Sequence, residues 1–370
     1  MQNLLIKVLK YTLLLLPFWP LPSRSQTINT APLDAYWKMV EPLKHGDSLS
    51  QEQWRHFLSL EANNIYIKNQ GFSDAYLESL RKNIQYVYMP QYDSLLKSRL
   101  KFIEADPASF WLTYKVYVYK KFETELKDFE EKIKEAHYLD DVYANAWQWL
   151  PKKLQKKDTS VTINLLGIEN DAIAGDGIII VTLWSLYNQD KLKPGILAGH
   201  EMHHVLRGGR GFRNVAEEDK GIIYFLNSVL NEGTADMVDK KYMLTRENEL
   251  PMEFQFSDFI LNQADSIIRQ VDTSLINMAH SNGRMYKTEK DYRNLIRWTS
   301  GHCPGYYMAD IIVINGYKKQ LLKNIRNPFY FIYLYNRAAL RDVKQPPVFA
   351  KASIQYIRSL EKKYLTGKNF

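Results

Sequence analysis

The sequence predicts an α+β fold that is mainly α-helical and contains one small β-sheet. Three observations support this prediction. Long stretches with helical periodicity occupy both ends of the chain, two β-rich segments lie between them, and the composition, 45% hydrophobic and 24% charged, is that of an ordinary globular protein. With 370 residues, the chain is long enough for one large domain or two ordinary ones.

Residues 1–25 have the pattern of an export signal. A basic start is followed by a short apolar run from Tyr11 to Leu21, and Ser23 to Ser25 provide small residues for cleavage before Gln26. The run is shorter than the roughly 20 apolar residues that cross a bilayer. We therefore expect a periplasmic or secreted protein that keeps no stable membrane span once the signal is removed. An uncleaved anchor is the alternative.

The charge and the cysteine content exclude several classes of protein. The net charge of +8 is spread along the chain and is not gathered in one stripe, so we expect no nucleic-acid partner. Cys303 is the single cysteine, so the chain forms no internal disulfide bond and no zinc site built from cysteines. Any bound metal must be held by histidine and carboxylate side chains.

Both ends of the chain are predicted to be helical. In the N-terminal region, residues 26–155, the spacing of apolar residues predicts helices at about 33–57, 74–104 and 107–154. The C-terminal region, residues 213–370, has the same texture. Its predicted helices lie at about 214–243, 251–279, 287–299, 305–325, 327–341 and 349–364.

Residues 156–212 are predicted to form the sheet and one further helix. The segments Ser160 to Leu166 and Ile178 to Leu183 are rich in β-branched and apolar residues, and the sequence Gly-Asp-Gly at 175–177 is a turn signal between them. The helix starts near Pro194, a residue that suits the first turn of a helix. These are the only segments of the chain that predict strands convincingly.

The predicted helix after the strands carries Gly-His-Glu-Met-His-His (199–204), which holds three of the chain's eight histidines. Residues four apart lie above one another on a helix, so His200 and His204 can direct two imidazoles at one ion. Glu201 lies about 100° further round and can reach a water on that ion without ligating it. This H-E-x-x-H pattern combines two metal ligands with a general base. His203 leans to the other side and could ligate only in a different register, so His204 is favoured.

A second helix is expected to complete the site. Residues 221–230 are apolar nearly all round, which indicates a buried helix, and Glu232 and Asp236 continue it four residues apart. An unpaired buried carboxylate is costly, and a metal ion together with a metal-bound histidine would provide a partner for each acid. The plainer interpretation is that the helix emerges into solvent here with two ordinary surface acids.

The two motifs together, H-E-x-x-H and then N-E-x-x-A-D at 231–236, resemble those of the gluzincin metallopeptidases. The resemblance implies a gluzincin-like catalytic core with a small sheet, an H-E-x-x-H helix and a following glutamate helix. It also implies that Glu232 is the third zinc ligand and that Asp236 hydrogen-bonds a zinc-bound histidine. The whole chain is similar to a bacterial family of exported zinc-dependent peptidases. Twenty-seven residues separate His204 from Glu232, more than is usual in gluzincins, so we expect a longer loop between the two helices.

The resemblance also implies how a substrate is held. In gluzincins the strand before the active helix is a sheet edge that pairs with an extended peptide, which gives this role to residues 178–183; a plain core strand is the alternative. These enzymes stabilise the oxyanion with a histidine or a tyrosine, and His302, Tyr306 and Tyr307 are the candidates because they begin an apolar helix. The alternative for these three residues is a helix N-terminus with packing aromatic side chains.

We therefore predict an exported metallohydrolase, most simply a peptidase that acts on peptides or proteins, with Zn2+ held by His200, His204 and Glu232. Glu201 would take a proton from a water on the ion and pass it to the leaving amine. Residues 213–370 would complete the catalytic domain. A non-catalytic, zinc-stabilised binding protein of the cell envelope is the main alternative. A carboxylate-bridged di-iron bundle would need a second Glu-x-x-His, which the sequence lacks.

Overall fold

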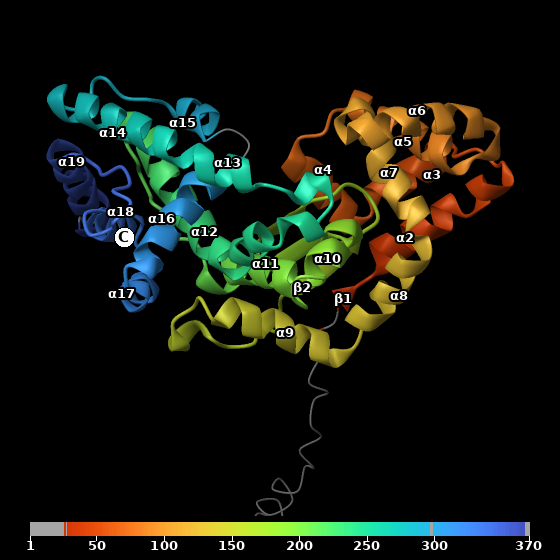
Figure 1. Ribbon diagram of the computed structural model, residues 1–370, viewed down its shortest axis with the longest axis horizontal. Helices are drawn as coiled ribbons and strands as arrows, with labels where there is room; N and C mark the ends of the chain where they lie inside the picture. Colours follow the sequence, from red (N-terminus) through yellow and green to blue (C-terminus); the bar gives the residue numbers. More distant parts are fainter. Residues whose placement is uncertain (1–25, 27, 297–298, 367–370) are drawn as a thin grey trace, which may run out of the picture.

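The computed structural model describes residue 26, residues 28–296 and residues 299–366, and the expected export signal (1–25) lies outside the described residues. Helices make up most of the described chain and a four-stranded mixed sheet lies among them, which confirms the predicted, mainly helical α+β fold. In Figure 1 the N-terminal helices form one lobe, the C-terminal helices form another, and the sheet lies between them. No helix in the described part of the chain has both the length and the apolar character that a bilayer crossing requires.

The helices are shorter than the sequence pattern suggests. Their bounds are α2 (Ala31–Val40), α3 (Gln51–Ser59), α4 (Glu61–Gln70), α5 (Asp74–Tyr88), α6 (Asp93–Ala105), α7 (Trp111–Lys121), α8 (Glu123–Ile133), α9 (Ala136–Trp147), α10 (Leu183–Asp190), α11 (Ile196–Arg207), α12 (Glu217–Thr245), α13 (Ser257–Asn262), α14 (Ala264–His280), α15 (Glu289–Leu295), α16 (His302–Ile314), α17 (Lys318–Lys323), α18 (Pro328–Ala339) and α19 (Lys351–Glu361). The helix expected at 74–104 is broken because Pro90 forces Met89 into an extended conformation. The segment 107–154 contains three consecutive helices, across which the apolar periodicity continues without a visible stop.

The sheet contains two strands that the sequence did not predict. It runs in the order β1 (Ile28–Asn29), β2 (Thr162–Leu166), β4 (Ile178–Thr182) and β3 (Ala172–Gly175). Strands β1, β2 and β4 are parallel, and β3 pairs antiparallel with β4. The prediction that residues 178–183 form a sheet edge is therefore wrong, since β4 lies between β2 and β3. The edge next to the H-E-x-x-H helix is β3, which was too short to be recognised from its periodicity.

The hydrophobic core has two parts, and α12 joins them. One cluster of buried residues packs around the sheet and the helices from α2 to α11, and the other packs around α12, α14, α16, α18 and α19. The long helix α12 lies against α16 at a distance that only glycine permits, because a Cβ on Gly233 would lie 2.3 Å from the carbonyl oxygen of Gly305. This close approach brings the start of α16 beside the middle of α12.

Helix α11, which carries the histidine motif, is fixed by contacts at its N-terminal half. Gly195 begins it in a left-handed conformation with φ of 67°, and Asn145 of α9 donates a hydrogen bond of 2.8 Å to the carbonyl of Pro194. A Cβ on Gly199 would lie 2.7 Å from Cβ of Asn145, so the glycine beside His200 allows α9 to pack directly against α11. The histidines therefore extend from a rigid, packed helix.

Candidate metal centre

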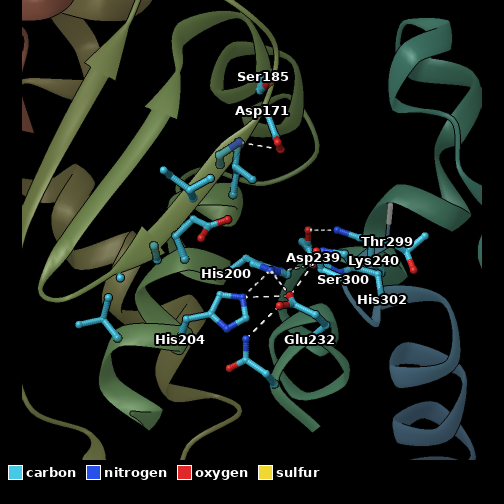
Figure 2. A pocket seen from close by; sticks show the side chains of 18 of the residues that line it. Asp171, Ser185, His200, His204, Glu232, Asp239, Lys240, Thr299, Ser300 and His302 are labelled. Atoms are coloured by element: carbon cyan, nitrogen blue, oxygen red, sulfur yellow. Dashed lines mark hydrogen bonds and ion pairs between the residues drawn. The ribbon is translucent and has the colours of Figure 1, made fainter. Parts of the chain in front are cut away.

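Two histidines of α11 and one glutamate of α12 converge on a single point. The Nε2 atoms of His200 and His204 lie 3.1 Å apart, and Oε2 of Glu232 lies 3.2 Å from Nε2 of His204 and 3.8 Å from Nε2 of His200. Figure 2 shows the three side chains pointing toward one another from their two helices. His200 is buried, and the other two are nearly so, with 13% of each side chain exposed. The structure thus brings together the three residues that the sequence assigned as ligands.

The donor set fits a zinc ion. Ligands at about 2.0–2.1 Å on a tetrahedral ion lie about 3.3 Å from one another, close to the separations of these three atoms. In neutral His200, a proton on Nδ1 that is donated to the carboxylate leaves the lone pair of Nε2 facing His204. The site thus offers two imidazole nitrogens and one carboxylate oxygen, and no cysteine sulfur. This set of ligand atoms suits a divalent cation of borderline softness.

The carboxylate that orients His200 is Asp239, a residue that the sequence analysis missed. Nδ1 of His200 lies 3.0 Å from Oδ1 of Asp239 and 3.9 Å from Oδ1 of Asp236. Lys240 donates to the other oxygen of Asp239 over 2.7 Å. Asp239 is seven residues after Glu232, and residues seven apart share a helix face. The spacing could have identified this acid as a second candidate.

Asp236 bonds to a different histidine from the one that the resemblance implied. Its Oδ1 lies 2.8 Å from Nδ1 of His302, at the start of α16. Nε2 of His302 in turn lies 3.4 Å from Oε2 of Glu232. Two buried aspartates of α12 therefore hold two histidines in the same way, and Lys240, 3.5 Å from Asp236, lies between their charges.

A chain of hydrogen bonds fixes the carboxylate of Glu232. Asn231 donates from Nδ2 to Oε1 of Glu232 over 2.9 Å, which leaves Oε2 facing the histidines. Arg207, at the end of α11, is buried and donates to Oδ1 of Asn231 and to the carbonyl of Ile325. Burial raises the pKa of Glu232, but the neighbouring charges of His204 and His302 outweigh burial and hold this pKa well below its ordinary value.

Glu201 and His203 lie on opposite sides of α11. Glu201 is 6% exposed and lines the cavity that contains the three donors. Burial raises the pKa of Glu201 above the ordinary value of a glutamate. His203 has its Nε2 3.3 Å from the carbonyl oxygen of Trp149, away from the other two histidines. Burial lowers the pKa of His203 well below its ordinary value, which identifies a neutral histidine of the core.

The metal donors line a cavity of about 1060 Å3. Its walls include the end of α4, the edge strand β3 with the turn after it, faces of α11 and α12, and the segment from Thr299 to His302. Of the three residues considered for the oxyanion, the described lining includes His302 but neither Tyr306 nor Tyr307. Tyr306 is buried in the second hydrophobic cluster and Tyr307 packs against that cluster. Both tyrosines therefore contribute to the packing of the C-terminal helices.

A comparison with known families matches residues 54–344 to the family described as "Putative zinc dependent peptidase (DUF5700)". The chain belongs to this family. The matched region contains every residue of the candidate metal centre, and its histidine and glutamate groups fit the zinc dependence that the DUF5700 description names. No curated protein and no solved structure shows a significant match to the chain.

Proposed function

We propose that the protein is an exported, zinc-dependent peptidase in which His200, His204 and Glu232 hold the ion. The observation that carries the proposal is the convergence of these three donors, within 4.8 Å of one another, in a cavity that also contains Glu201. Zinc bound at such a site supplies a Lewis acid that polarises a peptide carbonyl and lowers the pKa of a bound water. The zinc dependence in the family description supports the choice of metal.

In this proposal Glu201 moves the proton. Its carboxylate accepts a proton from the attacking water and then donates it to the amine of the leaving peptide, so that one residue serves as base and as acid. Burial favours the protonated form of Glu201 by raising its pKa, which brings its basicity closer to neutral pH. Because Glu201 is next to His200 on a packed helix, it reaches the substrate carbonyl from a fixed position.

His302 is the residue that we assign to the developing oxyanion. Burial lowers its pKa, but the charges of Asp236 and Glu232 outweigh burial and raise the pKa overall. In its charged form Nδ1–H donates to Asp236, and Nε2–H faces the metal donors, 3.4 Å from Oε2 of Glu232, where it would turn to a substrate oxygen once Glu232 binds the ion. The dyad of His302 and Asp236 thus provides an oriented donor.

The edge strand β3 provides a backbone surface for the substrate. One side of β3 pairs with β4, and residues 172–177 line the cavity from the other side. An extended peptide that adds to this edge would hydrogen-bond to the main chain without regard to its own sequence and would pass beside the metal donors. The surface supports a peptide substrate over a small molecule.

The direct test is digestion of a peptide library by the purified chain, starting at Gln26, with its zinc content measured in parallel. Cleavage that a chelator abolishes and added zinc restores is the expected result. If the folded, zinc-loaded protein cleaves no peptide or protein, the non-catalytic binding protein becomes the better assignment. Export is tested separately, by locating the protein in cell fractions with residues 1–25 present or deleted.

A further inference from the structure

The charged side chains that line the metal cavity are mostly acidic, although the whole chain has a net charge of +8. Besides its histidines, the described lining contains five carboxylates and one lysine, Lys240. The carboxylates belong to Asp171, Asp176, Glu201, Glu232 and Asp239. A cleft lined by one sign of charge attracts ligands of the opposite sign. The acidic character of this cavity therefore cannot be explained by the overall charge of the chain, which is positive.

Three of these carboxylates have a role in the proposed reaction. Glu232 holds the ion, Glu201 moves the proton, and Asp239 is bonded to His200 and Lys240. The remaining two flank the edge strand β3 (Ala172–Gly175), one immediately before it and one immediately after it. Their positions place both at the surface along which we expect the substrate to lie.

The backbone explains Asp176 but not Asp171. Asp176 has φ of 48° and precedes Gly177 with φ of 78°, so the pair forms the tight turn between β3 and β4 for which Asp-Gly is a preferred sequence. Asp171 precedes the strand in an exposed position of the cavity. It accepts hydrogen bonds from Nε2 of Gln70 over 3.2 Å and from the N–H of Ala172 over 2.8 Å. Both donors are neutral, so they fix the carboxylate without pairing it with a cation, although burial raises the pKa of Asp171 above its ordinary value.

Asp171 lines the same cavity as Glu201 and the three candidate metal donors. In Figure 2 Asp171 lies above the group formed by His200, His204 and Glu232, and Lys240 and His302 lie to the right of that group. A group bound by Asp171 would thus belong to a peptide that lies in the cavity with the metal donors.

We propose that Asp171 is a specificity-determining residue that binds a cationic group, ammonium or guanidinium, of the peptide. The proposal rests on the peptidase function proposed above and names the substrate class of that site. A charge-assisted hydrogen bond to a fixed carboxylate gives a stronger and more selective contact than a neutral one. Two parts of a peptide carry such a cation: the α-amino terminus, which would make the enzyme an aminopeptidase, and a lysine or arginine side chain.

The test uses the zinc-loaded chain and four peptides that differ only in charge. Each peptide carries lysine or the uncharged isostere norleucine at one position, and a free or acetylated N-terminus. For the wild type we expect a value of kcat/KM about tenfold higher when the recognised cation is present, equivalent to about 1.4 kcal/mol. Asp171→Asn should abolish that preference, so that the charged and the uncharged peptides are cleaved with equal kcat/KM. Asp176→Asn is the matched control and should keep the preference.

A binding measurement separates this proposal from the proposed function. Fluorescence anisotropy of the same labelled peptides on the zinc-loaded Glu201→Gln protein reports recognition without turnover. A preference for the cation that disappears in the Glu201→Gln, Asp171→Asn double variant supports the assignment even if the wild type cleaves none of the peptides. Equal binding of charged and uncharged peptides, or loss of the preference in Asp176→Asn as well, overturns it even if cleavage occurs.

Discussion

The Nδ1 atom of His200 donates to Oδ1 of Asp239 over 3.0 Å, and this hydrogen bond determines that Nε2 is the nitrogen left to bind a metal. The acid two turns beyond Glu232 on α12 therefore orients the first ligand. Asp236, the acid implied by the gluzincin resemblance, instead holds His302, 2.8 Å away. In the proposed mechanism, metal binding and oxyanion stabilisation would therefore depend on different aspartates of the same helix.

Replacing these two aspartates should separate the two roles. Asp239→Asn should weaken zinc binding by about 10- to 100-fold, because the imidazole of His200 loses the carboxylate that fixes its tautomer. Asp236→Asn should leave zinc affinity close to that of the wild type and lower kcat. Competition with a chromophoric chelator measures the affinity, and peptide cleavage at saturating zinc measures kcat. Equal loss of zinc in both variants would contradict the division.

Glu201→Gln tests the base. The amide keeps the size of the side chain but cannot accept the proton, so we expect turnover to fall by about 10²- to 10⁴-fold while zinc content stays at one equivalent. Metal analysis of the same preparation is the necessary companion measurement. Wild-type turnover in this variant would rule out Glu201 as the base.

Glu232→Ala tests the third ligand. Loss of the carboxylate leaves two histidines for the ion, and we expect most of the bound zinc to be lost on dialysis. Glu217→Ala is the control, because Glu217 lies on the same helix with its side chain 68% exposed and paired with Lys220 at the surface. Normal zinc content in Glu232→Ala would mean that another acid of the cavity completes the site.

The H-E-x-x-H pair was predictable because its geometry is local. The helix pitch alone places His200 and His204 together and turns His203 away. Glu232 was predictable because a carboxylate that continues an apolar helix needs a partner. The resemblance then implied that this partner is a metal ion. The mainly helical fold was also predictable from local information, because helical periodicity depends on residues that are close together in the sequence.

What the sequence did not reveal depends on contacts between distant segments. Arg207 reaches Glu232 only through Asn231, and that relay exists because α11 and α12 pack side by side. The helix predicted at about 214–243 is observed as α12 from Glu217 to Thr245, so the longer loop expected between the two helices is confined to residues 208–216. The acidic residues at the start of α12 form its first turn, where the helix dipole stabilises them.

The approach of α16 to α12 gives a prediction about stability. An added Cβ on Gly233 would lie 2.3 Å from a backbone oxygen that cannot move alone, so Gly233→Ala should destabilise the protein by about 1–3 kcal/mol. A loss of stability would be informative, because replacing glycine by alanine inside a helix otherwise stabilises the protein by about 1 kcal/mol. Gly211→Ala is the control, with nothing within 4 Å of the added atom. Urea denaturation measures both, and a stabilised Gly233→Ala would contradict the packing described here.

Asp190, at the end of α10, should make stability depend on pH away from the metal centre. Burial raises the pKa of Asp190 from 3.8 to about 7, although its carboxylate accepts a hydrogen bond from the N–H of Gly195. The folded protein therefore holds a proton that the unfolded chain releases near pH 4, so the stabilisation is complete below about pH 4 and is lost as the pH rises through about 7. Asp190→Asn stays neutral and keeps an oxygen for Gly195. The urea midpoint of this variant should exceed that of the wild type by more at pH 8 than at pH 5, and parallel profiles would show that Asp190 titrates normally.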